Sequence, residues 1–178
     1  MDNQQKKFDY HEEPPKTEKI NGIIYNMAAG TYKHAETIGN LYGILHDYFK
    51  GKSCRPYTSE LDIFFDEENN FRPDISLICD FSKMRDDGYH GAPTLVIEVL
   101  SVSTAKRDRR EKFNCYEKYG VKELWLINPE HETIEQYDLI DGTLQLQAIY
   151  FRPGTIFKSY VFEDLAISLD EAFDFYKF

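Results

Sequence analysis

The sequence is short of cysteine, with three in 178 residues, and these stand far apart without a Cys-x-x-Cys pair beside a histidine. That spacing excludes the usual structural zinc patterns. Three distant cysteines are also a poor basis for a disulfide framework. We therefore expect Cys54, Cys79 and Cys115 to be reduced, mostly buried thiols in a cytoplasmic protein.

Long hydrophobic runs are missing too. No stretch of about 18 apolar residues is present, which excludes a simple membrane-spanning helix, and the first residues are too polar for a signal peptide. We expect a soluble, cytoplasmic protein with no membrane partner. Residues 1–17 are charged and contain Pro14-Pro15, so we predict a flexible N-terminal arm followed by one domain over residues 18–178.

Positive charge is scarce: 21 Lys and Arg face 31 Asp and Glu, for a net charge of −10. The molecule as a whole would not attract nucleic acid, so any such binding needs a local basic patch. One candidate lies in residues 106–112, where the cations are Lys106, Arg107, Arg109, Arg110 and Lys112. A solvated helix face is the usual explanation of such a run, and contact with phosphates is the alternative.

What is present is an alternation of strand and helix patterns. Apolar residues at helical spacing predict a helix over about 32–50, with Thr31 as cap and Gly51 as end, and a second helix from Ser103 or Thr104 to Tyr119, ended by Gly120. The predicted strands are 57–65, 75–79, 94–100 and 124–127, with hairpins at 18–25 and 133–150. Residues 80–93 read as a surface loop and 169–176 as a short helix. The pattern indicates an α/β domain.

Two carboxylates sit at the predicted sheet. Asp74 follows Arg72-Pro73 at the start of a strand, and Glu98 interrupts the apolar run 94–100. A buried carboxylate is costly without a partner, so Glu98 is more readily explained by a functional site than by structure. Asp74 taken alone is better explained as a turn or strand-end acid that accepts hydrogen bonds from backbone amides. If the strands are neighbours, both acids can hold Mg²⁺ or Mn²⁺.

Three further side chains could support such a site. Asp108 and Lys112 are four residues apart on the second helix, and either an exposed ion pair or a site lysine fits this spacing. His34 begins the first helix on its apolar side, where a half-buried structural histidine is the first interpretation and a supporting role at the site is the second.

The motifs resemble a known family. They are Arg72-Pro73-Asp74, then Leu95-Val96-Ile97-Glu98-Val99-Leu100-Ser101, then Asp108-x-x-x-Lys112-x-x-x-Tyr116-x-x-x-Gly120, then Glu123-Leu124-Trp125-Leu126-Ile127-Asn128-Pro129. This order is similar to the Uma-two type of restriction endonucleases, a branch of the PD-(D/E)XK nuclease superfamily. The similarity extends from Asn21 to Leu169. Its departures are Leu100, where the superfamily places its lysine, and Val102 and Asn128, where this family usually has proline and often has aspartate.

The resemblance implies a restriction-endonuclease-like mixed central β-sheet flanked by helices. It implies metal ligation by Asp74, Glu98 and the backbone carbonyl of Val99, with the lysine moved to Lys112. The function implied is metal-dependent endonuclease cleavage of nucleic acid, DNA above all. The catalytic residues would be Asp74, Glu98 and Lys112, supported by Asp108 and His34, with nucleic-acid contacts from Lys106, Arg107, Arg109 and Arg110. A homodimer is expected because double-strand cutting needs two sites.

Two other functions remain open. A nuclease-fold protein that no longer cuts could serve as a binding or regulatory partner, because fold does not guarantee activity. A hydrolase of another phosphoester would keep the same residues and change only the substrate.

Overall fold

A mixed six-stranded sheet forms the centre of the computed structural model, which describes residues 15–177. Its strand order is β12-β11-β10-β9-β6-β3. β9 and β10 pair in parallel, and the other neighbouring strands of this sheet pair antiparallel. These strands are β3 (Arg55–Thr58), β6 (Ile75–Ile78), β9 (Leu95–Val99), β10 (Glu123–Asn128), β11 (Thr133–Ile140) and β12 (Thr143–Phe151). The predicted mixed central sheet is confirmed.

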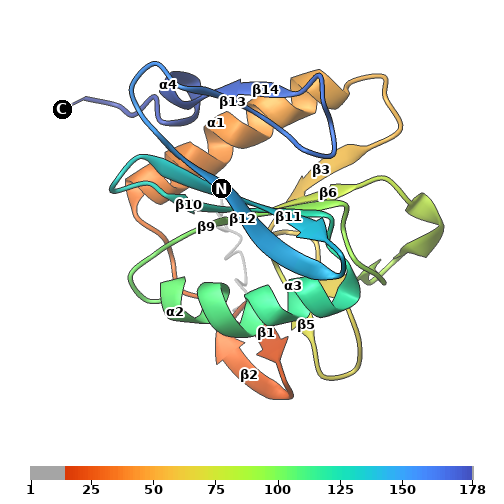
Figure 1. Cartoon of the computed structure of the whole chain (residues 1–178). Helices are drawn as coiled ribbons and strands as arrows, with labels where there is room; N and C mark the ends of the chain where they lie inside the picture. The colour runs from red at the N-terminus through yellow and green to blue at the C-terminus, as the bar shows by residue number, and fades with distance from the viewer. Residues whose placement is uncertain (1–14, 178) are drawn as a thin grey trace, which may run out of the picture.

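Helices cover both faces of this sheet (Figure 1). One face packs on α1 (Tyr32–Phe49), α4 (Leu169–Ala172) and the small sheet of β13 (Ile156–Lys158) and β14 (Ala166–Ser168). The other face packs on a continuous helical segment of α2 (Ala105–Arg107), a wider π-type turn η2 (Asp108–Lys112) and α3 (Phe113–Tyr119). Alternate residues of β9 therefore enter different cores: Leu95, Ile97 and Val99 face α1, while Val96 faces α3.

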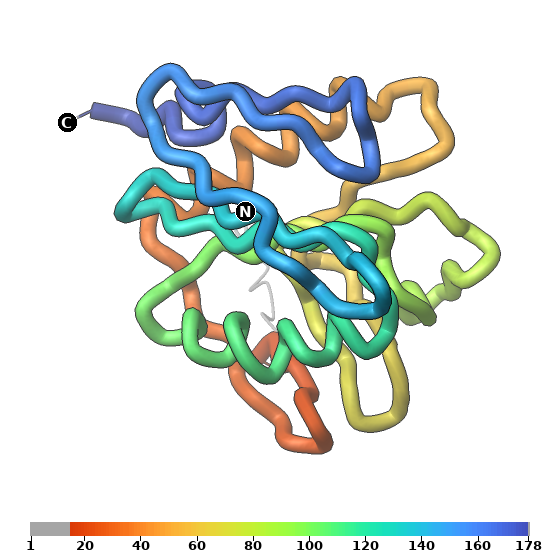
Figure 2. The backbone as a smooth tube through the Cα atoms, viewed as in Figure 1, coloured from red at the N-terminus to blue at the C-terminus, as the bar shows by residue number. Residues whose placement is uncertain are grey.

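A second sheet lies beside the helical segment. It contains β1 (Thr17–Ile20), β2 (Ile23–Asn26), β4 (Ile63–Phe64), β5 (Asn70–Phe71), β7 (Met84–Arg85) and β8 (Gly88–Tyr89). The β1–β2 hairpin turns at Asn21-Gly22, where both residues have positive φ (49° and 77°), as the Asn-Gly signal predicts. Figure 2 shows this hairpin, in red, next to the green helical segment. β1 begins at Thr17, and the amide of Met27 donates to the carbonyl of Lys16, so the last residues of the predicted arm pair within the hairpin. Residues 1–14 of that arm lie outside the described part.

Three sequence predictions were wrong in detail. The strand expected at 57–65 is two strands in two different sheets, separated by a turn in which Leu61 N donates to Thr58 O. The expected loop 80–93 contains the short 3₁₀ turn η1 (Phe81–Lys83) and buries Tyr89 through the β7–β8 pair. The last helix stops at Ala172, which buries Phe173 and leaves Tyr176 exposed.

The prediction of three reduced cysteines was also wrong. Cys54 and Cys79 form a disulfide with their Cα atoms 4.1 Å apart, and Cys115 is free and buried, as expected. Antiparallel pairing of β3 with β6 sets Arg55 opposite Ile78, which brings the two flanking cysteines together. That pairing spans 25 residues and leaves no trace in the cysteine spacing.

Removing the disulfide is expected to destabilise the protein, because the unfolded chain regains loop entropy. The Cys54→Ser/Cys79→Ser variant should lose about 3 kcal/mol of unfolding free energy, measured by urea titration. Reductant should cause a similar loss in the wild type. Alkylation of the denatured, unreduced protein should label only Cys115; labelling of all three cysteines would contradict the disulfide.

Two carboxylates are buried side by side on β10 and β11. Glu123 faces Asp138 across the strands. The carboxylate of Glu123 accepts hydrogen bonds from Trp125 Nε1 (2.7 Å), Gln136 Nε2 (2.7 Å) and Ser159 Oγ (2.5 Å). Within the described chain Asp138 Oδ1 has no hydrogen-bond partner. Burial, with the charge of Glu123 in second place, raises the pKa of Asp138 to about 6.

This raised pKa predicts a pH-dependent stability. The folded state holds the proton more tightly than the unfolded state, so stability falls as pH rises from about 4 to about 6 and is level above. Asp138→Asn should therefore gain about 2 kcal/mol relative to wild type between pH 4.5 and pH 8. Urea titration at both pH values measures this. Asp164→Asn, at an exposed aspartate, is the control, and an equal difference at both pH values would contradict the assignment.

Candidate active site

Strands β6 and β9 bring the two predicted acids together. Ile75 pairs with Ile97 in antiparallel register, so the preceding residue, Asp74, lies opposite Glu98. Pro73 suits the position before the strand because it has no amide hydrogen to donate to the ladder. Both acids line one pocket, which we call the central pocket. It is lined by Glu18, Asn26, Met27, Ala28, Gly30, His34, Arg72, Asp74, Glu98, Val99, Ser101, Ser103, Thr104, Arg107, Asp108 and Lys112.

Asp74 is held on two sides. Its Oδ2 accepts from the backbone amide of Val99 at 2.7 Å and lies 3.5 Å from His34 Nε2. His34 reaches the pocket because α1 begins there, capped by Thr31 as predicted. The pKa of His34 is raised. Burial by itself would lower this pKa, but the hydrogen bond to Asp74, the negative charge of Asp74 and the carbonyl of Val99 together outweigh burial. His34 thus lines the central pocket beside Asp74, an arrangement that fits both a half-buried structural histidine and a supporting role at the site.

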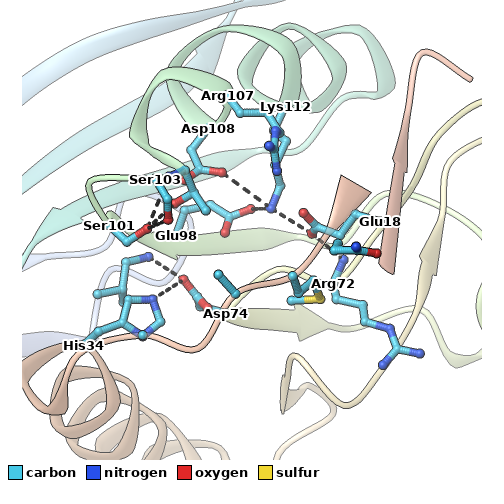
Figure 3. A pocket seen from close by; sticks show the side chains of 16 residues that line it. Glu18, His34, Arg72, Asp74, Glu98, Ser101, Ser103, Arg107, Asp108 and Lys112 are labelled. Carbon is cyan, nitrogen blue, oxygen red and sulfur yellow. Dashed lines mark hydrogen bonds and ion pairs between the residues drawn. The ribbon is translucent and has the colours of Figure 1, made fainter. Parts of the chain in front are cut away.

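Lys112 enters the central pocket from η2. Its Nζ lies 2.6 Å from Glu98 Oε1, 3.0 Å from Glu18 Oε1 and 3.7 Å from Asp108 Oδ1 (Figure 3). The side chains of Lys112 and Asp108 are only 3% and 5% exposed, which excludes the surface ion pair considered from their spacing. Tyr116, one helical turn further on, also donates to Glu98 Oε1.

The charges around Lys112 do not balance. Four carboxylates line the central pocket, from Glu18, Asp74, Glu98 and Asp108. The cations that line it are Lys112, Arg107 and Arg72, and the guanidinium of Arg72 is paired with Asp62. Burial raises the pKa of Glu98 well above its usual range, and the neighbouring acids raise it further. Burial also raises the pKa of Asp108. Lys112 stays protonated, because its three carboxylate contacts raise its pKa in spite of burial. Three carboxylates thus share the single charge of Lys112, and this local excess of negative charge favours a cation.

Glu18 and Tyr116 were not among the predicted site residues. Glu18 lies on β1, is 6% exposed, and its Oε1 also accepts from the backbone amide of Arg72 at 2.9 Å. The alternation of β1 carries a signal, because Glu18 and the apolar Ile20 fall on the same face of a strand. Its partner Lys112 is 94 residues away, however, and the sequence does not show that contact.

The four predicted nucleic-acid contacts do not form one strip. Arg107 lines the central pocket and lies over the ring of Tyr25 at 4.0 Å. Arg109 makes two hydrogen bonds with Glu135, at 2.6 and 2.7 Å. Arg110 lines a separate depression beside Asn21 and Lys118, and Lys106 is exposed. The helical segment therefore directs these cations to different sides.

Comparisons with known proteins identify the family and the fold of the chain. The family described as "Putative restriction endonuclease" (Uma2) matches residues 4–170. A crystal structure from Anabaena variabilis, described as a "putative nuclease belonging to DUF820", superposes with a TM-score of 0.75 at 22% identity and covers 90% of each chain. That likeness shows a shared fold.

Two similar proteins come from Synechocystis sp. One, slr1290, is 33% identical over 102 residues, which are 57% of this chain and 54% of the relative. The other, sll1609, is 28% identical over 129 residues, 70% of this chain and 73% of the relative. The match thus spans about half of the first relative.

The chain is a mixed α/β protein with the fold of the Anabaena variabilis protein. The match over most of the sequence shows that the chain belongs to the Uma2 family. Among residues 15–177, no helix is both long and apolar enough to cross a membrane.

Loss of Lys112 is expected to destabilise the fold, because it leaves buried carboxylates without their cation. Lys112→Ala should lower the unfolding free energy by about 3–5 kcal/mol at neutral pH. The loss should shrink at acidic pH as Glu98, whose pKa is raised, takes up a proton. The matched control is Lys106→Ala on the exposed side of the same helical segment, which should change stability by less than about 0.5 kcal/mol. Equal effects of the two substitutions would contradict the buried role.

Proposed function

We propose that this protein is a metal-dependent endonuclease that hydrolyses phosphodiester bonds in DNA, with Mg²⁺ as its ion and Mn²⁺ as a substitute. The observation that carries the proposal is the meeting of Asp74, Glu98 and Lys112 in one pocket, from two strands and a helix. Membership of a restriction endonuclease family supports the reaction class. A homodimer belongs to the proposal, because cutting both strands of a duplex needs two sites.

The residues of the central pocket fit a divalent cation by their chemistry. Asp74 and Glu98 offer hard oxygen atoms, which Mg²⁺ and Mn²⁺ prefer. The four lining carboxylates outnumber the lining cations Lys112, Arg107 and Arg72, so a further cation would relieve their repulsion. Among the described residues, no three His, Cys, Asp or Glu side chains are arranged as a complete metal site. The ligand set we propose is accordingly two carboxylates, Asp74 and Glu98, with the backbone carbonyl of Val99.

The protein's own groups have distinct tasks in this proposal. The amide of Val99 and the ring of His34 orient Asp74. Lys112 supplies a fixed positive charge and N–H donors for the phosphate oxygen that gains charge during the displacement. Asp108 and Glu18 hold Lys112 in place. A bound cation would contribute charge neutralisation at the phosphate and a lower pKa for the attacking water.

Arg107 is the nucleic-acid contact that the geometry favours among the four predicted cations. It is the one among them that lines the central pocket. Arg109 is already paired with Glu135, so a phosphate would have to compete with that carboxylate. Lys106 and Arg110 could contact only more distant parts of a substrate.

The proposal is tested by cleavage of supercoiled and single-stranded DNA with Mg²⁺, with Mn²⁺ and with chelator. Wild type should cut only when a metal is present. Asp74→Asn and Glu98→Gln, which keep the side-chain shape, should lower the rate by more than about 100-fold, above the loss typical of residues that only orient a metal ligand. Asp164→Asn at the exposed surface should cut at the wild-type rate.

Calorimetric titration with Mn²⁺ distinguishes the alternatives. Suppose that wild type binds Mn²⁺, Asp74→Asn does not, and neither DNA form is cleaved. This result would indicate that the substrate is another phosphoester. No binding and no cleavage, with or without DNA, would favour a nuclease-fold protein that acts as a binding partner.

A further inference from the structure

Glu18 lies outside the group of residues that the proposed reaction uses directly. It belongs to β1, whose hairpin partner β2 leads through residues 27–31 into α1. Its carboxylate nevertheless reaches Lys112 Nζ at 3.0 Å, and both side chains are almost fully buried. A buried carboxylate at this position costs folding free energy, so its contact with Lys112 requires an explanation.

Lys112 is shared between two glutamates. Its shorter contact is with Glu98, at 2.6 Å, and its second is with Glu18. Glu98 is also the acid that we assign to the cation. A cation and an ammonium repel each other, so a carboxylate that turns to the cation binds the lysine less strongly. If Glu98 were the sole anchor, Lys112 would lose its place at the moment when the site is assembled.

Glu18 is built to be the second anchor. The same Oε1 atom that meets Lys112 accepts from the backbone amide of Arg72 at 2.9 Å, which orients the carboxylate. The guanidinium of Arg72 is turned to Asp62, with contacts of 2.9 and 2.7 Å, which holds Arg72 itself in place. Figure 3 shows Glu18 on the side of Lys112 away from Asp74.

Asp108 is less suited to the same task. Its Oδ1 lies 3.7 Å from Lys112 Nζ, beyond the usual length of an N–H···O bond. It belongs to the same turn of helix as Lys112, so it cannot tie the helical segment to another part of the fold. Glu18 can do so, because it comes from the N-terminal hairpin.

We propose that Glu18 is a positioning residue that keeps Lys112 in place when Glu98 turns to the cation. The proposal rests on the proposed metal-dependent reaction and adds the β1–β2 hairpin to the machinery of the site. Glu18 touches neither substrate nor cation in this scheme. It acts through Lys112 alone.

The first test needs neither cation nor substrate. Acylation of lysine amines, followed by peptide mass spectrometry, reports how far Lys112 leaves the pocket. Glu98→Gln removes the charge of the first anchor and so imitates the state in which Glu98 binds the cation instead of Lys112. Glu18→Gln removes the charge of the second anchor. The matched control is Glu60→Gln, which removes the charge of a glutamate in an exposed ion pair with Lys16.

Each anchor should suffice alone. Labelling of Lys112 in Glu18→Gln and in Glu98→Gln should stay within about threefold of wild type, and in the double variant it should rise at least about tenfold beyond the product of the single effects. Glu60→Gln should add nothing to Glu98→Gln. A double variant that labels like Glu98→Gln would overturn the proposal. Thermal unfolding of each variant identifies an increase that comes from global unfolding.

The second test measures cleavage. Glu18→Gln should lower kcat by about 10- to 100-fold, as for other residues that orient a catalytic group, and leave KM within about threefold. Glu18→Ala should be slower still, so that glutamine restores part of the rate by accepting the same hydrogen bonds. An unchanged kcat in Glu18→Gln would overturn the proposal. If wild type does not cut, the endonuclease proposal fails, and the labelling experiment still decides the role of Glu18.

Discussion

The site depends on the ion pairs that the buried ammonium group of Lys112 makes. Lys112 is 3% exposed and meets carboxylates from β1, β9 and its own helical turn. Charges taken out of water are tolerated only with well-placed partners. The N-terminal hairpin, the central strand and the helical segment must therefore keep their positions relative to one another.

The same cluster explains how an acidic protein could act on a polyanion. A pocket with four carboxylates repels phosphate, and of the cations on the helical segment that were predicted to bind nucleic acid, Arg107 lines it. Under the proposed function, a divalent cation held by Asp74 and Glu98 would offset much of this negative charge. In this view metal and substrate binding are coupled, because the acids that repel the substrate are the ones that collect the cation.

Much of the fold could be predicted from local signals. The helix Tyr32–Phe49 has its cap at Thr31, an apolar stripe at helical spacing and a glycine after its end, and each of these acts within a few residues. The Asn21-Gly22 and Asp141-Gly142 turns produced hairpins for the same reason. The prediction failed at residues 57–65, where polar residues in a mostly apolar run mark a turn between two sheets, and at 80–93, where one tyrosine is core.

By itself the sequence indicated most element types, the family and the candidate site residues Asp74, Glu98 and Lys112, because strand and helix periodicity and motif order are local properties of the chain. Only the tertiary structure decided that Glu18 and Tyr116 join the cluster, that Arg109 turns to Glu135, and that Cys54 reaches Cys79. Periodicity says which face of an element a side chain occupies. Which side chain it contacts 18 to 94 residues away depends on strand register and helix placement, to which the whole core contributes.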